Sequence, residues 1–278
     1  MNERSPGADE GLPTAEHDGL ARRCPACGAV RQQIPEYSVS AEFYDVLHGA
    51  EYRRSALELA APAAAARLGI VELGAGTGLV TEVLVSASSV PVHVVEPAAA
   101  MRAVLLSRLA AAGPDTLGRV TVHPCPAQQL GLAAQADLAV CLRVIAGLPP
   151  VERRSVWHSA ATWLLPGGLL LVDRPPRHLP AEPRQRVVGE VRIGIDTYTA
   201  RLTEHPKGDH VQLDYTYLVR RQGRVIRRAE ETFHQWPLTD EELDRELADA
   251  GFRLEGEQTP GVLRLRRLDH QDVITHRN

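Results

Sequence analysis

Hydrophobic positions follow two patterns that divide the chain into a core and an insertion. Up to residue 173, short apolar runs alternate with segments of helical period, which is typical of parallel strands joined by helices. The strands expected are 68–73, 91–96, 119–123, 136–142 and 168–173, and the helices between them are 79–87, 99–111 and 151–165. Because parallel neighbours need right-handed crossovers, this order predicts a doubly wound sheet.

The second pattern has period two and lies in segments 196–205, 210–220 and 224–235. One face of the middle segment carries a row of apolar side chains: Val211, Leu213, Tyr215, Tyr217 and Val219. Turn signals separate the segments, so residues 187–236 are predicted to form a small inserted antiparallel sheet. An uncovered apolar row would favour aggregation, and we therefore expect the main domain or a second subunit to cover it.

After the insertion the chain returns to the main sheet. A capping box at 239–242 begins a helix that Gly251 ends, and strands 252–258 and 261–268 follow as a hairpin. The fold class predicted is therefore α/β, with a mostly parallel, doubly wound, seven-stranded sheet and an inserted antiparallel sheet. The expected organisation is a disordered arm at 1–36, a core of 37–186 and 237–268 that begins with a helical cap, the insertion at 187–236, and a tail at 269–278.

The most informative motif is a glycine turn after the first strand. Gly74, Gly76 and Gly78 follow the buried run 68–73, and Glu96 ends the next strand. Glycines allow a tight turn and a close approach of the backbone to a ligand, and a second-strand acid can accept both ribose hydroxyls. These features indicate a nucleoside cofactor. The spacing differs from the G-x-G-x-x-G of dinucleotide sites.

With Glu72 just ahead, this motif resembles that of class I S-adenosylmethionine-dependent methyltransferases. The resemblance implies S-adenosylmethionine as cofactor, S-adenosylhomocysteine as product, and Glu72 near the methionine ammonium. The cofactor-binding residues that it implies are Tyr44, Glu72, Gly74, Ala75, Gly76, Thr77, Gly78, Glu96, Pro97, Met101, Ala127, Gln128 and Leu142.

Within this class the chain looks most like enzymes that N,N-dimethylate aminosugars in antibiotic pathways. The segments that carry the likeness are 43–49 with Tyr52, 74–78, Glu96 with Met101, 163–168, 217–219, 230–231 and 238–239. Two positions depart from that pattern. Cys125-Pro126 replaces a Gly-Asp pair that reads adenine, which leaves the Ala127 N–H and Gln128 or Gln129 for that task, and Gly147 stands where those enzymes have a histidine.

Fewer residues are candidates for binding the methyl acceptor than for binding the cofactor. Tyr44, on the capping helix, is expected to pack against the sulfonium and bring a hydroxyl to the substrate. His178 and His234 are candidate proton acceptors, although both are also compatible with solvated loop and sheet positions. Arg143 follows the fourth strand and suits a carboxylate or phosphate, or a salt bridge within the protein. Tyr217 either binds substrate or packs the inserted sheet.

Composition limits the function further. The chain has 278 residues, 44% of them hydrophobic, and its formal charge of −4 and pI near 6.3 disfavour nucleic-acid binding. No membrane span or signal peptide is expected, so the cytoplasm is the predicted location. Cys24 and Cys27 resemble half of a zinc knuckle, with His17 as the nearest further ligand, and no metal is predicted.

These observations predict a methyltransferase that acts on a small metabolite in specialised metabolism, on nitrogen or oxygen, and that forms a possible homodimer. The alternative is the same fold with a structural cofactor that catalyses a cyclisation or another non-transfer reaction. The acceptor, its nucleophilic atom and the number of methyl groups added stay open.

Overall fold

The computed structural model describes residues 37–269. The expected arm at 1–36, with His17, Cys24 and Cys27, and nearly all of the expected tail therefore lie outside the described residues. Within the described part, no helix is long and apolar enough to cross a membrane.

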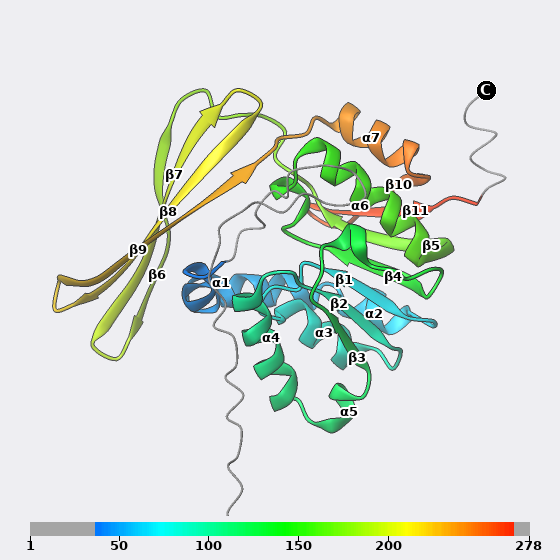
Figure 1. The fold of residues 1–278 in the computed structure, drawn as a ribbon, viewed down its shortest axis with the longest axis horizontal. Coiled ribbons are helices and arrows are strands. Elements are labelled where there is room, and N and C mark those ends of the chain that lie inside the picture. Colours follow the sequence, from blue (N-terminus) through cyan, green and yellow to red (C-terminus); the bar gives the residue numbers. More distant parts are fainter. Residues whose placement is uncertain (1–36, 270–278) are drawn as a thin grey trace, which may run out of the picture. The chain divides into compact units, whose positions relative to one another are not determined.

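The main sheet has seven strands in the order β10-β11-β5-β4-β1-β2-β3 (Figure 1). Their bounds are β1 Ile70–Leu73, β2 Val92–Val95, β3 Val120–His123, β4 Ala136–Cys141, β5 Leu164–Asp173, β10 Phe252–Thr259 and β11 Val262–Arg267. β1 pairs in parallel with β2 and β4, whereas β11 runs antiparallel to both β5 and β10. The predicted fold class is confirmed, and the reversal of strand order beside β1 places the glycine turn where open α/β sheets bind ligands.

Helices cover both faces of this sheet. One face packs against α2 (Ala60–Ala65), α3 (Leu79–Ala87), α4 (Ala99–Ala111) and the end of α1 (Ser40–Leu57), and the other against α6 (Pro150–Trp163) and α7 (Asp240–Asp249). Trp157 and Trp163 lie at the centre of the second core. A short α5 (Pro114–Leu117) and the 3-10 turns η1 (Ala127–Gln129) and η2 (Ile145–Gly147) complete the unit, and α5 was not predicted.

The inserted sheet has four strands where three were predicted. They are β6 (Arg184–Ile193), β7 (Asp196–Lys207), β8 (His210–Arg221) and β9 (Arg224–Gln235), paired in that order. The predicted start at 187 was therefore wrong, because β6 begins at Arg184. Its polar and apolar residues do not alternate, and a register shift between Val187 and Gly189 interrupts the period of two on which the prediction depended.

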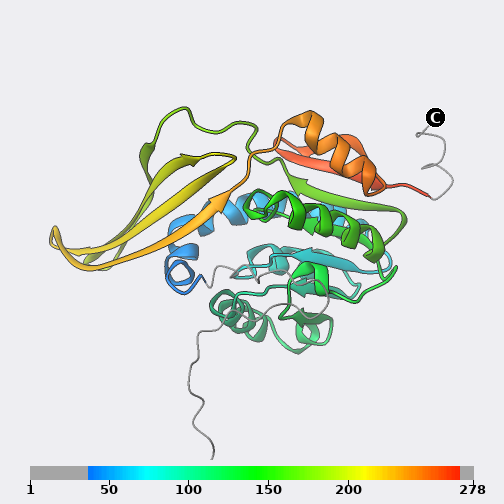
Figure 2. The same ribbon diagram turned by 45° about the horizontal axis from the view of Figure 1, so that its top comes forward.

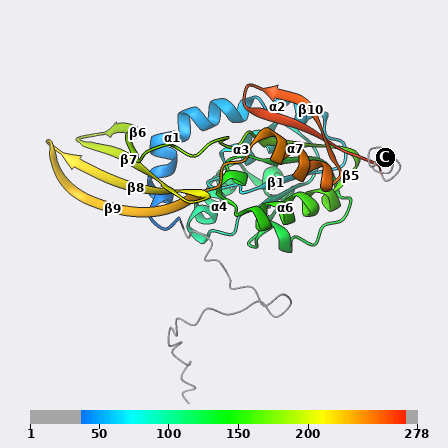
Figure 3. The ribbon, with the colours of Figure 1, turned by 90° about the horizontal axis from the view of Figure 1, so that it is seen from above.

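The predicted apolar row of β8 is covered by the same chain. Val211, Leu213, Tyr217 and Val219 are each 5% exposed or less. Phe43 of α1 packs with Tyr217 and Val219, while Leu179, of the segment after β5, packs against the cluster that contains Val211 and Leu213. Figures 2 and 3 show α1 passing from the inserted sheet to the main sheet. Coverage by the main domain, one of the two expected alternatives, is thus what the structure contains.

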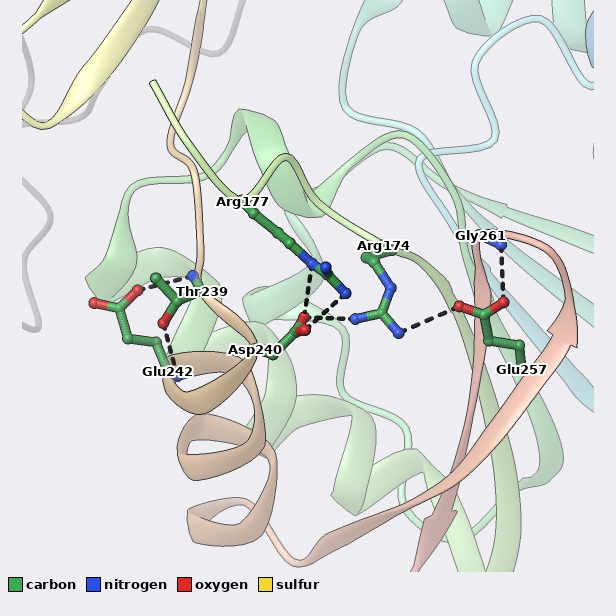
Figure 4. Close-up of polar contacts among 7 residues, drawn as sticks. All are labelled: Arg174, Arg177, Thr239, Asp240, Glu242, Glu257 and Gly261. Carbon is green, nitrogen blue, oxygen red and sulfur yellow. Dashed lines mark hydrogen bonds and ion pairs between the residues drawn. The ribbon is translucent and has the colours of Figure 1, made fainter. Parts of the chain in front are cut away.

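Polar contacts fix the chain where it returns from the insertion (Figure 4). Thr239 and Glu242 form the predicted capping box, with Oγ1 of Thr239 3.2 Å from the Glu242 nitrogen. Arg174, which follows β5, donates to Asp240 at 2.6 Å and to Glu257 of β10 at 3.2 Å. These bonds connect α7 and the final hairpin to the end of β5, next to the ligand edge.

Candidate active site

The glycine turn connects β1 to α3 with three left-handed residues. The φ angles of Gly74, Gly76 and Gly78 are 64°, 57° and 88°. A Cβ on Gly74 would lie 2.2 Å from Val144, and one on Gly78 would lie 2.6 Å from Leu105, whereas a Cβ on Gly76 would meet nothing within 4 Å. Two of the glycines are therefore required by packing against neighbouring elements, and Gly76 is the one that faces open space.

Glu96 lies directly beyond β2 and holds this turn. One carboxylate oxygen accepts the Gly76 N–H at 2.7 Å and the other accepts the Ala98 N–H at 2.8 Å. The residue is 5% exposed. Burial raises the pKa of Glu96, and the two N–H bonds oppose that rise because they stabilise the carboxylate.

Glu72 is a second buried carboxylate beside the turn. It is 3% exposed and accepts a hydrogen bond from the Thr81 hydroxyl of α3 at 2.6 Å. Burial raises the pKa of Glu72 to about 7; the Thr81 bond opposes this rise, and the nearby Glu96 charge adds to it. A carboxyl group with such a pKa is poised to ionise when a cation arrives.

These groups fit an S-adenosyl cofactor. The space before Gly76 leaves room for a ligand against the backbone, Glu96 retains lone pairs for ribose hydroxyls, and Glu72 suits an ammonium group. Most of the remaining predicted contacts follow the carboxyl ends of the strands beside β1. Met101 is buried in α4, Leu142 follows β4, Ala127 and Gln128 lie in η1, and Pro97 lies between Glu96 and Ala98.

An ion-pair cluster attaches α1 to the glycine turn. Asp45 of α1 accepts the Thr77 hydroxyl bond at 2.6 Å and pairs with Arg108 of α4. Arg108 also donates its Nε–H to the Thr77 carbonyl at 3.0 Å. Since Thr77 is itself part of the turn, the capping helix and α4 are both held to the loop that faces the ligand.

Three ring side chains lie along one face of α1. Tyr44, His48 and Tyr52 are spaced by four residues, and the His48 and Tyr52 rings stack with centroids 5.3 Å apart. Burial raises the pKa of Tyr44 and lowers the pKa of His48. Tyr44 therefore keeps its proton, and the His48 imidazole is neutral at pH 7. His48 was not among the predicted site residues, although its spacing from Tyr44 would have indicated it.

Arg143, which lies just beyond β4, contacts the face of α1 that carries Tyr44, His48 and Tyr52. It has a left-handed backbone, with φ of 60°, and its N–H donates to the Asp173 carboxylate at 2.8 Å. The guanidinium lies 3.9 Å from the centroid of the Tyr52 ring. The strained backbone and the bond to β5 fix the direction of Arg143, so the structure does bring it together with the α1 face.

Aromatic side chains of the inserted sheet lie near the same region. The rings of Tyr37 and Phe233 have centroids 4.9 Å apart, and Tyr215 packs edge-on to Phe233 at 5.7 Å. Burial raises the pKa of Tyr37, with further contributions from the carboxylates of Glu96 and Glu231. Tyr37 thus lies close to both the cofactor acid and the inserted sheet. It was expected in the capping helix but was not among the predicted site residues, and the structure places it just before α1.

Three predicted acceptor-side residues lie elsewhere. His178 is exposed in the loop after β5. His234 is also exposed; it pairs with Gln212, so its side chain lies on the face of the inserted sheet opposite the row that packs against α1. Tyr217 is 4% exposed, and its hydroxyl lies 2.9 Å from that of Ser40. The structure does not bring His178 or His234 together with Tyr44.

Comparisons with known proteins agree with this geometry. Residues 71–170 match the family model described as a methyltransferase domain. No curated protein sequence matches the chain.

Solved structures share the fold at low sequence identity. An amino pentose methyltransferase from Micromonospora echinaspora, involved in calicheamicin biosynthesis, is 23% identical, with a TM-score of 0.61 over 78% of this chain and 91% of that one. The CcbJ methyltransferase from Streptomyces caelestis is 21% identical, with a TM-score of 0.67 over 86% and 100%. A sugar N-methyltransferase from a Streptoalloteichus species is 21% identical, with a TM-score of 0.61 over 95% and 100%.

The strand order, the glycine turn and the two buried acids are those of a class I methyltransferase fold, and the family match covers the segment that contains the glycine turn and both acids. Residues 71–170 thus carry a methyltransferase domain, within a chain that has the class I methyltransferase fold.

Proposed function

We propose that the protein transfers the methyl group of S-adenosylmethionine to the nitrogen or oxygen of a small-molecule acceptor in specialised metabolism. The observation that carries the proposal is the ring-bearing face of α1, where Arg143 of the cofactor edge lies over the Tyr52 ring and where Tyr215 of the inserted sheet is close enough to Tyr52 to interact with it electrostatically. The sugar and amino pentose methyltransferases among the similar structures support the acceptor class. Cytoplasmic location and a homodimer stay predictions.

The chain's contributions to such a reaction are positioning and proton handling. When bound, the cofactor supplies an activated methyl group on a sulfonium. Tyr44, Tyr52 and Arg143 would orient the acceptor and exclude water, which supplies much of the rate enhancement for an in-line displacement. Arg143 suits an acceptor that carries a carboxylate or phosphate.

His48 is the proposed proton acceptor for an alcohol or phenol. Burial lowers the pKa of its imidazole, so that it is neutral and able to accept a proton near pH 7. An amine acceptor needs no base if it attacks in its neutral form. His48→Gln should therefore lower kcat by about 100-fold for an oxygen nucleophile, and far less for an amine that is already neutral. The test is the pH profile of kcat for both classes of acceptor.

Product masses test the proposed function itself. Incubation with S-adenosylmethionine and a panel of aminosugars, phenols and hydroxylated acids should give products heavier by one methylene equivalent, together with S-adenosylhomocysteine. A product of unchanged mass would instead support the alternative of a structural cofactor and a rearrangement. The Gly76→Val variant, in which a side chain would enter the open space before the turn, is the matched inactive control.

A further inference from the structure

The N-terminus of α1 has no side-chain cap from its own residues. The N-cap residue is Val39, whose apolar side chain cannot accept a hydrogen bond from the N–H groups of the first turn. The Ser40 N–H instead donates to Oε2 of Glu231 at 2.8 Å, and the Ser40 hydroxyl also donates to that oxygen. A carboxylate at this point also interacts favourably with the helix dipole. The cap therefore comes from β9, 191 residues further along the chain.

Further contacts between the inserted sheet and α1 surround this cap. Tyr217 accepts or donates a bond with the Ser40 hydroxyl and stacks on Phe43 with centroids 4.6 Å apart. Arg227 pairs with Glu42 and lies over the Phe43 ring at 5.5 Å. The insertion thus contacts the first turn of α1 through the Glu231 carboxylate, the Tyr217 hydroxyl and ring, and Arg227.

The opposite side of the same helix segment is attached to the glycine turn through Asp45 and Thr77. Tyr44 lies about one turn and His48 about two turns from Ser40, and both lie within one turn of Asp45. A change in the direction of the α1 N-terminus would therefore move these side chains relative to Arg143, whereas the bond between Gly76 and Glu96 joins the turn after β1 to the end of β2 and includes no residue of α1.

We propose that Glu231 is a positioning residue that sets the direction of α1 by capping it from the inserted sheet, and so places the Tyr44–His48–Tyr52 face for the acceptor. The expected effect on turnover rests on the proposed function. The capping of α1 by Glu231 does not depend on that function. Glu231 does not touch the reacting atoms in this role; it acts through Ser40.

The test compares Glu231→Ala and Glu231→Gln with a matched control. Glu230→Ala changes the adjacent carboxylate, which is exposed and pairs with Arg228 on the other face of the strand. Glu231→Ala should lower kcat/KM for the acceptor by about 10- to 100-fold, because small displacements cost that much in an alignment-dependent reaction. The affinity for S-adenosylmethionine should not change. Glu231→Gln keeps one acceptor oxygen and should restore part of the loss, and Glu230→Ala should behave as wild type.

Hydrogen exchange gives a readout that needs no acceptor. Amides 40–44 should exchange faster in Glu231→Ala than in wild type or Glu230→Ala, while amides 92–98 keep their protection. Unchanged exchange at 40–44 would overturn the cap. Faster exchange with unchanged kcat/KM would overturn the positioning role. If no acceptor is methylated by the wild type, the proposed function fails while the exchange result still decides the cap.

Discussion

The cofactor edge of the main sheet and the inserted sheet hold the site in different ways. At the cofactor edge, the bonds from Thr81 to Glu72 and from Gly76 to Glu96 join residues 9 and 20 positions apart, and the glycine backbone itself shapes the surface. In the insertion, the bonds to Ser40 join residues 177 and 191 positions apart, and a side chain of β8 or β9 takes part in each. The cofactor surface is therefore a local property of the sequence, whereas the acceptor surface depends on tertiary contacts.

Substitution at Gly76 tests the local part of this comparison and should have the largest effect. In Gly76→Val, a β-branched side chain would occupy the open space before the turn at a φ of 57°, which such residues rarely adopt. S-adenosylmethionine binding should fall below detection by calorimetry. The strain should also cost roughly 1–3 kcal/mol of stability.

Gly208→Val separates the strain from the occupied space. Gly208 has a φ of 64° in the turn between β7 and β8, and its Cβ would also meet nothing within 4 Å. This variant should lose similar stability, measured by chemical denaturation, and keep its cofactor affinity. Equal loss of binding in both variants would show that global destabilisation, and not the space before the turn, explains the result.

Removal of the Glu96 carboxylate should have the next largest effect. Glu96→Ala takes away the acceptor for ribose hydroxyls and also frees the Gly76 and Ala98 N–H groups. We expect binding of S-adenosylmethionine to weaken by about 1–3 kcal/mol, which is roughly 5- to 150-fold. Calorimetry on folded protein checks this, and an unchanged affinity would remove Glu96 from the site.

The pH dependence of cofactor binding tests the second acid. Burial raises the pKa of Glu72 from 4.5 to about 7, so the carboxyl group is largely protonated below pH 7. An ammonium ligand favours the ionised form, and affinity should therefore increase with pH below 7, by up to about tenfold per unit, and then level off. Glu72→Gln should bind more weakly and remove this slope. A wild-type affinity that is constant between pH 5 and 8 would contradict the role of Glu72.

The raised pKa of Glu72 also makes the stability of the cofactor-free protein depend on pH. The folded-state pKa lies above the unfolded value, so the unfolded state loses its proton first as pH rises. The contribution of Glu72 to stability is complete below about pH 4.5 and is lost as pH rises through about 7. Denaturation of wild type and Glu72→Gln across this range measures the difference.

Features that depend on residues close together in the sequence could be predicted from it. The glycine spacing, the strand periods and the capping box at Thr239 each depend on residues within a few positions, and the structure contains all three. Sequence reasoning did not find β6, whose bulge near Gly189 hides the alternation, or Tyr37, whose partner Phe233 lies far along the chain. His48 was missed although its spacing from Tyr44 is local. Sequence reasoning also could not assign a face to His234, because that depends on the register of β9.

The smallest effect is expected for His234, and it tests the face assignment in the inserted sheet. The side chain pairs with Gln212 and lies near His210 and Trp236, with ring centroids 5.2 and 6.0 Å away, on the face opposite Phe233 and Tyr215. His234→Ala should change turnover by no more than about twofold and stability by no more than about 0.5 kcal/mol, as for other surface substitutions.

Phe233→Ala, one position earlier and on the face toward Tyr37, is the matched comparison and should lower acceptor turnover much more. If His234→Ala proved as damaging as Phe233→Ala while cofactor affinity stayed normal, the outer face of the inserted sheet, and not the α1 face, would be the acceptor side.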